Sequence, residues 1–146
     1  MKLISTKLDH TYKVAKIIAK KIKLAKKSRY AIVVGLFGDL GAGKTTITQN
    51  FGNLVGVKNI INSPTFVILK RYKLDWEGFK KLIHIDAYRL NSGKELIELG
   101  FNDILKERNS IIFIEWPERI KDILPYQTIT IKIQHVSKNK RIINVN

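Results

Sequence analysis

An apolar run followed at once by a glycine-rich loop constrains the possible fold of this chain more than any other feature. The run, Tyr30 to Phe37 (YAIVVGLF), does not alternate apolar with polar residues, which predicts a strand buried on both faces of a parallel sheet. The next residues, Gly38 to Thr45 (GDLGAGKT), fit the pattern G-x-x-x-x-G-K-[ST], and a helix is predicted from Lys44 to about Val55. A strand, this loop and a helix in that order form the setting in which the pattern holds phosphates.

The residue types of the loop match the chemistry of a nucleoside triphosphate. Its glycines let the backbone wrap closely, so that several N–H groups and the positive end of the helix dipole point at one phosphate chain. Lys44 supplies a point charge for the β- and γ-phosphates, and the Thr45 hydroxyl is an oxygen ligand of the kind that Mg²⁺ prefers. The expected nucleotide-binding residues are Gly38, Asp39, Leu40, Gly41, Ala42, Gly43, Lys44, Thr45 and Thr46.

Two predicted strands end in an acidic residue, and a phosphate-loop enzyme needs a carboxylate at such a position for its metal shell. One strand (LIHID) ends at Asp86 and the other (IIFIE) at Glu115. Both acids are expected at the carboxyl edge of the sheet, where ligands bind. The strands alone do not choose between them: one should serve the metal, and the other should orient the attacking water or a switch loop. His84 is expected to pack or hydrogen-bond, because three histidines without ligand spacing do not predict a zinc site.

The charge balance is strongly basic, with 27 Lys and Arg against 12 Asp and Glu and a formal charge of +15. Such a charge favours a polyanionic partner, most obviously nucleic acid. A compositional origin is equally open, because 21 Lys, 23 Ile and 10 Asn together are typical of an AT-rich coding bias. The chain has no cysteine, which excludes disulfides, thiolate catalysis and cysteine metal sites. With neither a membrane-length apolar run nor a signal peptide, a cytoplasmic location without membrane contact is expected.

An amphipathic helix is predicted over residues 9–27. Its apolar face should comprise Val14, Ile18, Ile22 and Ala25, which recur at helical spacing. A second stripe on the same helix consists of lysines and is interpreted as a solvated face, with an RNA or partner surface as the alternative. The stripe is formed by Lys13, Lys16, Lys20, Lys23 and Lys27.

The remaining segments predict an α/β fold with a mixed, largely parallel sheet flanked by helices and antiparallel strands in the C-terminal half. The whole chain, residues 1–146, is expected to form a single P-loop domain, in the P-loop NTPase class. Further strands are predicted at 65–73, 81–85, 110–114, 127–134 and 141–145, with turns at 75–78 and 137–140 and short helices at 94–99 and 102–107.

Four segments together resemble the TsaE family, small bacterial ATPases that take part in the threonylcarbamoyl modification of adenosine 37 in certain tRNAs. They are Gly38 to Thr46, Ser63-Pro64-Thr65-Phe66, His84 to Leu90 and Glu115-Trp116-Pro117-Glu118. Their order and spacing fit across nearly the whole chain. Two small departures are an alanine at position 87 and a short tail after Arg141, which puts any nucleotide contact of that arginine in doubt.

The resemblance implies slow ATP hydrolysis in complex with the partner proteins TsaD and TsaB. It implies Mg²⁺ held by Thr45 and Glu115, so Glu115 rather than Asp86 becomes the expected metal ligand. The implied catalytic residues are Lys44, Asp86 and Glu115. It also implies a switch-like loop at Ser63 to Phe66 that responds to the γ-phosphate, and a position for Trp116 near the nucleotide.

Two other functions remain open at this stage. A small P-loop kinase would commonly carry an arginine-rich lid over the phosphates, whereas here six arginines are scattered and no lid-length insertion is evident. A nucleotide-dependent RNA-binding module without useful catalysis would bind RNA with a steep salt dependence. The lysine stripe of the first helix favours this second alternative only weakly.

Overall fold

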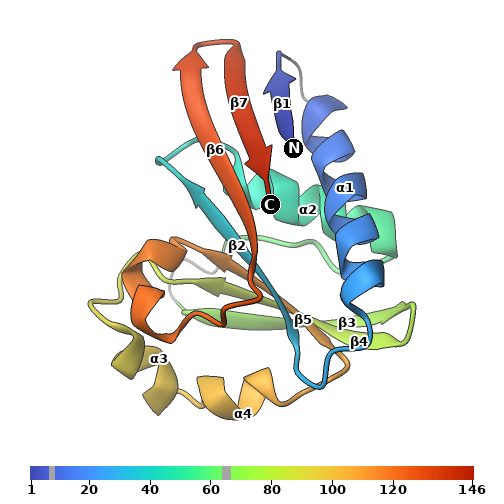
Figure 1. The fold of residues 1–146 in the computed structure, drawn as a ribbon, viewed down its shortest axis with the longest axis vertical. Coiled ribbons are helices and arrows are strands. Elements are labelled where there is room, and N and C mark those ends of the chain that lie inside the picture. The colour runs from blue at the N-terminus through green and yellow to red at the C-terminus, as the bar shows by residue number, and fades with distance from the viewer. Residues whose placement is uncertain (7–8, 64–66) are drawn as a thin grey trace.

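The computed structural model describes residues 1–6, 9–63 and 67–146, and in these residues one mixed sheet is flanked by helices (Figure 1). The strands are β1 (Lys2–Ser5), β2 (Ile32–Gly38), β3 (Leu69–Trp76), β4 (Phe79–Asp86), β5 (Ser110–Glu115), β6 (Ile129–Ser137) and β7 (Lys140–Val145). The helices are α1 (Asp9–Ala25), α2 (Lys44–Val55), α3 (Gly93–Glu98), α4 (Phe101–Leu105) and the 3-10 helix η1 (Pro117–Ile123). The seven described strands lie in the order β1-β7-β6-β2-β5-β4-β3.

The centre of the sheet is parallel. β2 pairs in parallel with both β5 and β6, and β4 pairs in parallel with β5. Every residue of β5 is buried, as the unbroken apolar run predicts for a strand covered on both faces. The carboxyl ends of β2, β4 and β5 therefore meet at one edge of the sheet, where ligand sites of open α/β folds form.

Antiparallel strands occupy both edges of the sheet, and one edge is formed by the two strands that the predicted turn at 75–78 joins. β3 pairs with β4 at one edge, whereas β7 pairs with β6 and β1 pairs with β7 at the other. The N-terminal strand β1 was not predicted, because its four residues are too few to show a periodicity and their burial depends on β7 from the far end of the chain.

Two apolar cores fill the spaces between the sheet and its helices. One core includes residues of α1 and α2, and the other includes residues of α3, α4 and η1. β2 contributes to both, since alternate side chains of a strand point to opposite faces: Ile32 and Val34 join the first core and Val33 the second. Figure 1 shows these helices on the two sides of the twisted sheet.

The helix predicted over residues 9–27 is confirmed but ends at Ala25, and the prediction for Ala25 itself is wrong. Ala25 is exposed, whereas Val14, Ile18 and Ile22 are buried as expected. The buried face includes Ala15 and Ala19 as well, and both belong to the core that α1 shares with α2. The predicted lysine stripe is exposed along its length.

The hairpin before β4 is tighter than the predicted turn at 75–78. β3 runs to Trp76, and the connection consists of Glu77 and Gly78, whose φ angles of 53° and 88° suit a short hairpin turn. Trp76 packs edge-on against Phe51 with ring centroids 5.9 Å apart, so this tryptophan belongs to a core. The predicted start of β3 at residue 65 falls in segment 64–66, outside the described residues, and the described strand begins at Leu69.

The predicted helices at 94–99 and 102–107 correspond to α3 and α4, whereas η1 was not predicted. No helix in the described parts of the chain is long and apolar enough to cross a membrane.

Candidate functional site

The glycine-rich loop joins β2 to α2 at the carboxyl edge of the parallel strands, as its sequence setting predicts. A side chain at Gly38 would bring a Cβ atom within 2.9 Å of the Ile133 carbonyl oxygen on β6, so glycine is required by the close approach of two backbones. Gly43 precedes α2 with a φ of 104°, a left-handed conformation that side chains other than glycine rarely adopt. The loop conformation is therefore set by backbone demands that only glycine meets.

Lys44 folds back over the loop that precedes it. Its Nζ donates hydrogen bonds to the carbonyl oxygens of Gly38, at 2.5 Å, and Asp39, at 3.0 Å. The residue is only 5% exposed, and this burial lowers the pKa of its ammonium group. The negative charge of Glu115 opposes that shift most strongly, and Glu118, Asp86 and Asp39 oppose it less. The site thus concentrates a desolvated positive charge at the mouth of the loop, facing carboxylates.

Thr45 and Glu115 meet although 70 residues separate them. The Thr45 hydroxyl donates to the Glu115 carboxylate, with its Oγ1 2.9 Å from Oε1 and 3.1 Å from Oε2. Glu115 is 4% exposed at the end of β5, beside β2. The site therefore contains two converging hard-oxygen groups next to an ammonium group. A hydroxyl, a carboxylate and phosphate oxygens are the donor set that Mg²⁺ takes in nucleotide sites.

His84 completes a buried chain of contacts behind Glu115. Its Nε2 lies 2.6 Å from Glu115 Oε2, and the side chain is fully buried on β4. The expected hydrogen-bonding role is confirmed at Nε2, while Nδ1 has no hydrogen-bond partner among the described residues. His84 therefore fixes one carboxylate oxygen of Glu115 while Thr45 contacts both.

Asp86 lies beside Glu115 in the register of β4 and β5 but makes different contacts. Its carboxylate accepts a hydrogen bond from the Tyr88 backbone N–H at 3.0 Å and one from the Ser63 hydroxyl at 3.4 Å. Both strand-end acids thus reach the same edge, as their positions predicted. Glu115 contacts the glycine-rich loop, whereas Asp86 contacts the first residue of the predicted switch-like loop, whose residues 64–66 are outside the described part of the chain.

Trp116 forms a wall of the site. The Lys44 Nζ lies 4.0 Å from the centroid of the Trp116 ring. The ring of Tyr88 also packs against Trp116, with the two ring centroids 5.0 Å apart. Trp116 has a φ of 58°, a left-handed conformation that is uncommon outside glycine. This sharp turn directly after Glu115 places the indole above Lys44, and strained residues of this kind cluster at functional sites.

Arg141 and Glu118 are the residues of this site to which the sequence assigned no chemistry. Arg141, on β7, lies against the loop, with its Nη2 3.4 Å from the Gly41 carbonyl oxygen. Glu118 has a buried Oε2 without a hydrogen-bond partner among the described residues, and it faces Lys44. Glu118 belongs to the segment Glu115 to Glu118, which the sequence had singled out. Arg141 lies on a predicted strand, but its contact with the loop is visible only in the structure.

The other residues predicted to bind the nucleotide lie in the loop or in the first turn of the helix after it. Leu40 is exposed at the loop tip, Ala42 is buried beneath it, and Thr46 follows in the first turn of α2. Among the described residues, no group of three or more His, Asp or Glu side chains could hold a metal ion. A Mg²⁺ site at a nucleotide does not need such a group, because phosphates and water supply the other ligands.

Comparison with known proteins gives this geometry a family. The model of the family described as "Threonylcarbamoyl adenosine biosynthesis protein TsaE" matches residues 5–143. The chain belongs to the TsaE family. TsaE proteins are involved in tRNA threonylcarbamoyladenosine biosynthesis, so the family reading of the four sequence segments is confirmed.

Individual TsaE proteins show the extent of the similarity. The TsaE of Bacillus subtilis is 37% identical over 109 residues, which cover 75% of this chain and 65% of that protein. The TsaE of Rickettsia felis is 36% identical over 144 residues, which cover 98% of this chain and 78% of that protein. The crystal structure of Bacillus subtilis YdiB is similar with a TM-score of 0.73 and 28% identity, covering 99% of this chain and 83% of that one. The similarity thus extends over the whole sheet and is not limited to the glycine-rich loop.

Proposed function

We propose that this chain is a Mg²⁺-dependent P-loop ATPase that acts with TsaD- and TsaB-like proteins in threonylcarbamoylation of adenosine 37 of tRNA. ATP hydrolysis would drive a conformational cycle of the complex in the cytoplasm, and tRNA would meet the complex through the partners or through a basic surface of this chain. One observation carries the ATPase proposal: the Thr45 hydroxyl and the Glu115 carboxylate meet 2.9 Å apart at the mouth of the glycine-rich loop, beside Lys44.

The residues of the loop would bind the triphosphate. The backbone N–H groups from Gly38 to Thr46 would surround the phosphates, with the start of α2 directed at them. Lys44 would exchange its two carbonyl partners for phosphate oxygens, which bind an ammonium group more strongly than neutral carbonyls do. Thr45 and Glu115 would hold Mg²⁺, whose positive charge would neutralise the phosphate oxygens during transfer to water.

The second acid would control the position of water rather than the metal. Asp86 already accepts a hydrogen bond from Ser63, the first residue of the predicted switch-like loop. A carboxylate in this place would orient the attacking water or help to position the switch-like loop. Trp116 would cover the nucleotide from the side on which it now covers Lys44.

The proposal is tested by following the γ-phosphate of labelled ATP with the chain alone, with TsaD- and TsaB-like proteins, and with tRNA. Label in free phosphate that rises when the partners are added supports the ATPase. Label in a small acceptor would instead identify a kinase. Negligible phosphate release with tight, salt-sensitive RNA binding would identify an RNA-binding module and would contradict the proposal.

His84 provides a prediction about the metal rather than about the fold. We expect His84→Ala to raise the Mg²⁺ concentration needed for half-maximal ATP hydrolysis by about 10-fold, since partners behind a metal ligand typically contribute 10- to 100-fold to metal affinity. The Mg²⁺ titration at saturating ATP measures this change. His84→Gln should recover much of it, because a glutamine amide N–H can replace the Nε2 contact to Glu115. Equal Mg²⁺ requirements in His84→Ala and wild type would show that His84 only fills space.

A further inference from the structure

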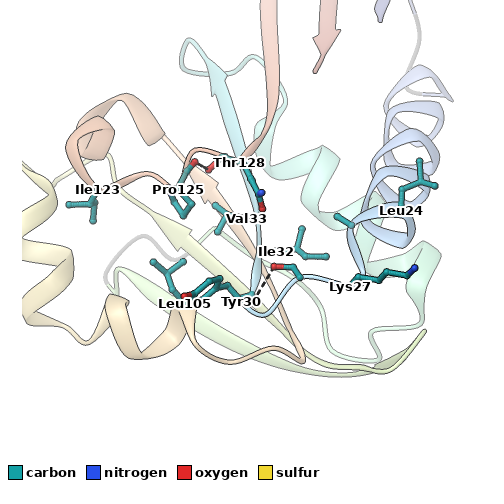
Figure 2. A pocket seen from close by; sticks show the side chains of 13 residues that line it. Leu24, Lys27, Tyr30, Ile32, Val33, Leu105, Ile123, Pro125 and Thr128 are labelled. Carbon is teal, nitrogen blue, oxygen red and sulfur yellow. Dashed lines mark hydrogen bonds between the residues drawn. The ribbon is translucent and has the colours of Figure 1, made fainter.

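A large apolar groove lies at the opposite end of the sheet from the glycine-rich loop (Figure 2). Its volume is about 680 Å³, and its lining comes from the end of α1 and the residues after it, the start of β2, the end of α4, η1 and the segment before β6. Val33, Leu105, Ile123 and Pro125 line it, and Figure 2 shows these side chains gathered around one open space. Volumes of this size are typical of binding sites rather than of packing defects.

The groove exists because one neighbour of β2 starts later than the other. β2 pairs with β5 from Ile32 onward, but its pairing with β6 begins only at Val34. The chain before β6 turns away, and this turn is fixed by Thr128, whose N–H and hydroxyl both donate to the Pro125 carbonyl oxygen, at 3.1 and 2.6 Å. These hydrogen bonds therefore hold the groove open, and the groove is part of the fold.

Large apolar side chains stand exposed around the groove. Tyr30, which lines it, is 60% exposed, and Tyr126, between two lining residues, is fully exposed. Leu24, at the end of α1, is 78% exposed. A cluster of exposed large apolar side chains around a concave surface is typical of a protein-binding site. A small molecule inside the groove would leave these exposed side chains uncovered.

The charges at this end of the molecule are mostly positive. Lys27 is the one charged residue among those that line the groove. The nearby acids Asp75, Glu77 and Glu107 are each paired with a lysine, at 2.7, 3.0 and 3.3 Å. Basic residues of the same end have no acidic partner among the described residues; they are Lys27, Arg29, Lys106 and Arg108. These four outnumber the two acids near lining residues that have no basic partner among the described residues, Asp103 and Asp122, so the complementary surface is acidic.

We propose that this groove binds a segment of a partner protein that carries apolar side chains flanked by Asp or Glu. The lining favours a protein segment over RNA, because Val33, Leu105, Ile123 and Pro125 are aliphatic, whereas RNA bases are held chiefly by aromatic stacking and hydrogen bonds. The groove and Lys44 lie at opposite ends of the sheet, so a partner in the groove leaves the glycine-rich loop accessible. This inference does not depend on the ATPase proposal.

The test uses a phage-displayed library of random 12-residue peptides, selected on the full chain and counter-selected on Tyr30→Glu. We expect selected peptides that combine apolar residues with Asp or Glu. A synthetic copy with a fluorescent label should bind at least 10-fold more weakly to Tyr30→Glu. It should also bind more weakly to Lys106→Glu, which reverses the charge next to the lining residue Leu105. Tyr12→Glu is the matched control: Tyr12 is exposed at the other end of α1, and its variant should bind like wild type.

Other outcomes would overturn the proposal. Peptides without an acidic and apolar composition, or peptides that bind Tyr30→Glu and wild type equally, would show that the groove is not a docking site for such a segment. A labelled 12-nucleotide RNA that binds wild type and loses 10-fold affinity in Tyr30→Glu would assign the groove to nucleic acid instead. Because Tyr30 and Lys106 are exposed, circular dichroism should show both variants folded.

Discussion

Lys44→Ala is expected to lower the rate of ATP hydrolysis by at least about 100-fold, the usual cost of removing one group that stabilises developing charge. In the structure, the Lys44 ammonium is buried at the mouth of the loop, with backbone carbonyls as its hydrogen-bond acceptors. Phosphate release under saturating ATP and Mg²⁺, in the presence of the partner proteins, measures the loss. Alanine removes the charge and leaves the glycine-rich backbone in place.

Lys58→Ala is the control for the loss of one lysine charge from a basic chain. Lys58 is exposed in the segment after α2, so this variant should hydrolyse ATP at the wild-type rate. Thermal unfolding in ATP and Mg²⁺ gives a second measurement, because a ligand that binds only the folded state raises the unfolding temperature. Hydrolysis by Lys44→Ala within threefold of wild type would contradict the proposed site.

Glu115→Gln is expected to raise the Mg²⁺ concentration for half-maximal hydrolysis by about 10- to 100-fold, at least as much as the loss of a supporting partner behind a ligand. The substitution keeps the shape of the side chain and an oxygen that can accept from the Thr45 hydroxyl, but it removes the negative charge. Titrations of Mg²⁺ at fixed ATP measure the shift. Binding of Mg²⁺-free ATP should change little, since the loop backbone and Lys44 are unaltered.

Glu98→Gln is the matched control, because Glu98 is exposed on α3. An unchanged Mg²⁺ requirement in Glu115→Gln would remove this residue from the metal site.

Asp86→Asn separates the two acids: we expect a slower maximal rate with a near wild-type Mg²⁺ requirement. The reverse pattern in Glu115→Gln and Asp86→Asn would exchange their roles.

The central strands and the loop could be predicted because their signals are local. An unbroken apolar run such as that of β5 can be satisfied only by burial on both faces, and the loop glycines meet backbone demands within a few residues. The pairing of β1 with β7 and the exposure of Ala25 depend on which surfaces meet. Such contacts join distant segments, and no periodicity within one segment reports them.

The sequence by itself determined the family, the phosphate-loop pattern and the two strand-end acids, because each is written in a short run of residue types. The family resemblance already implied that Glu115 rather than Asp86 accompanies Thr45. Only the tertiary structure shows that the Thr45 hydroxyl contacts the Glu115 carboxylate and that His84 contacts it from behind. It also placed Arg141 against Gly41 and opened the groove beside β2. The physical reason is that hydrogen bonds at 3 Å and cavities are properties of strand register and chain turns, which arise when residues far apart in sequence pack together.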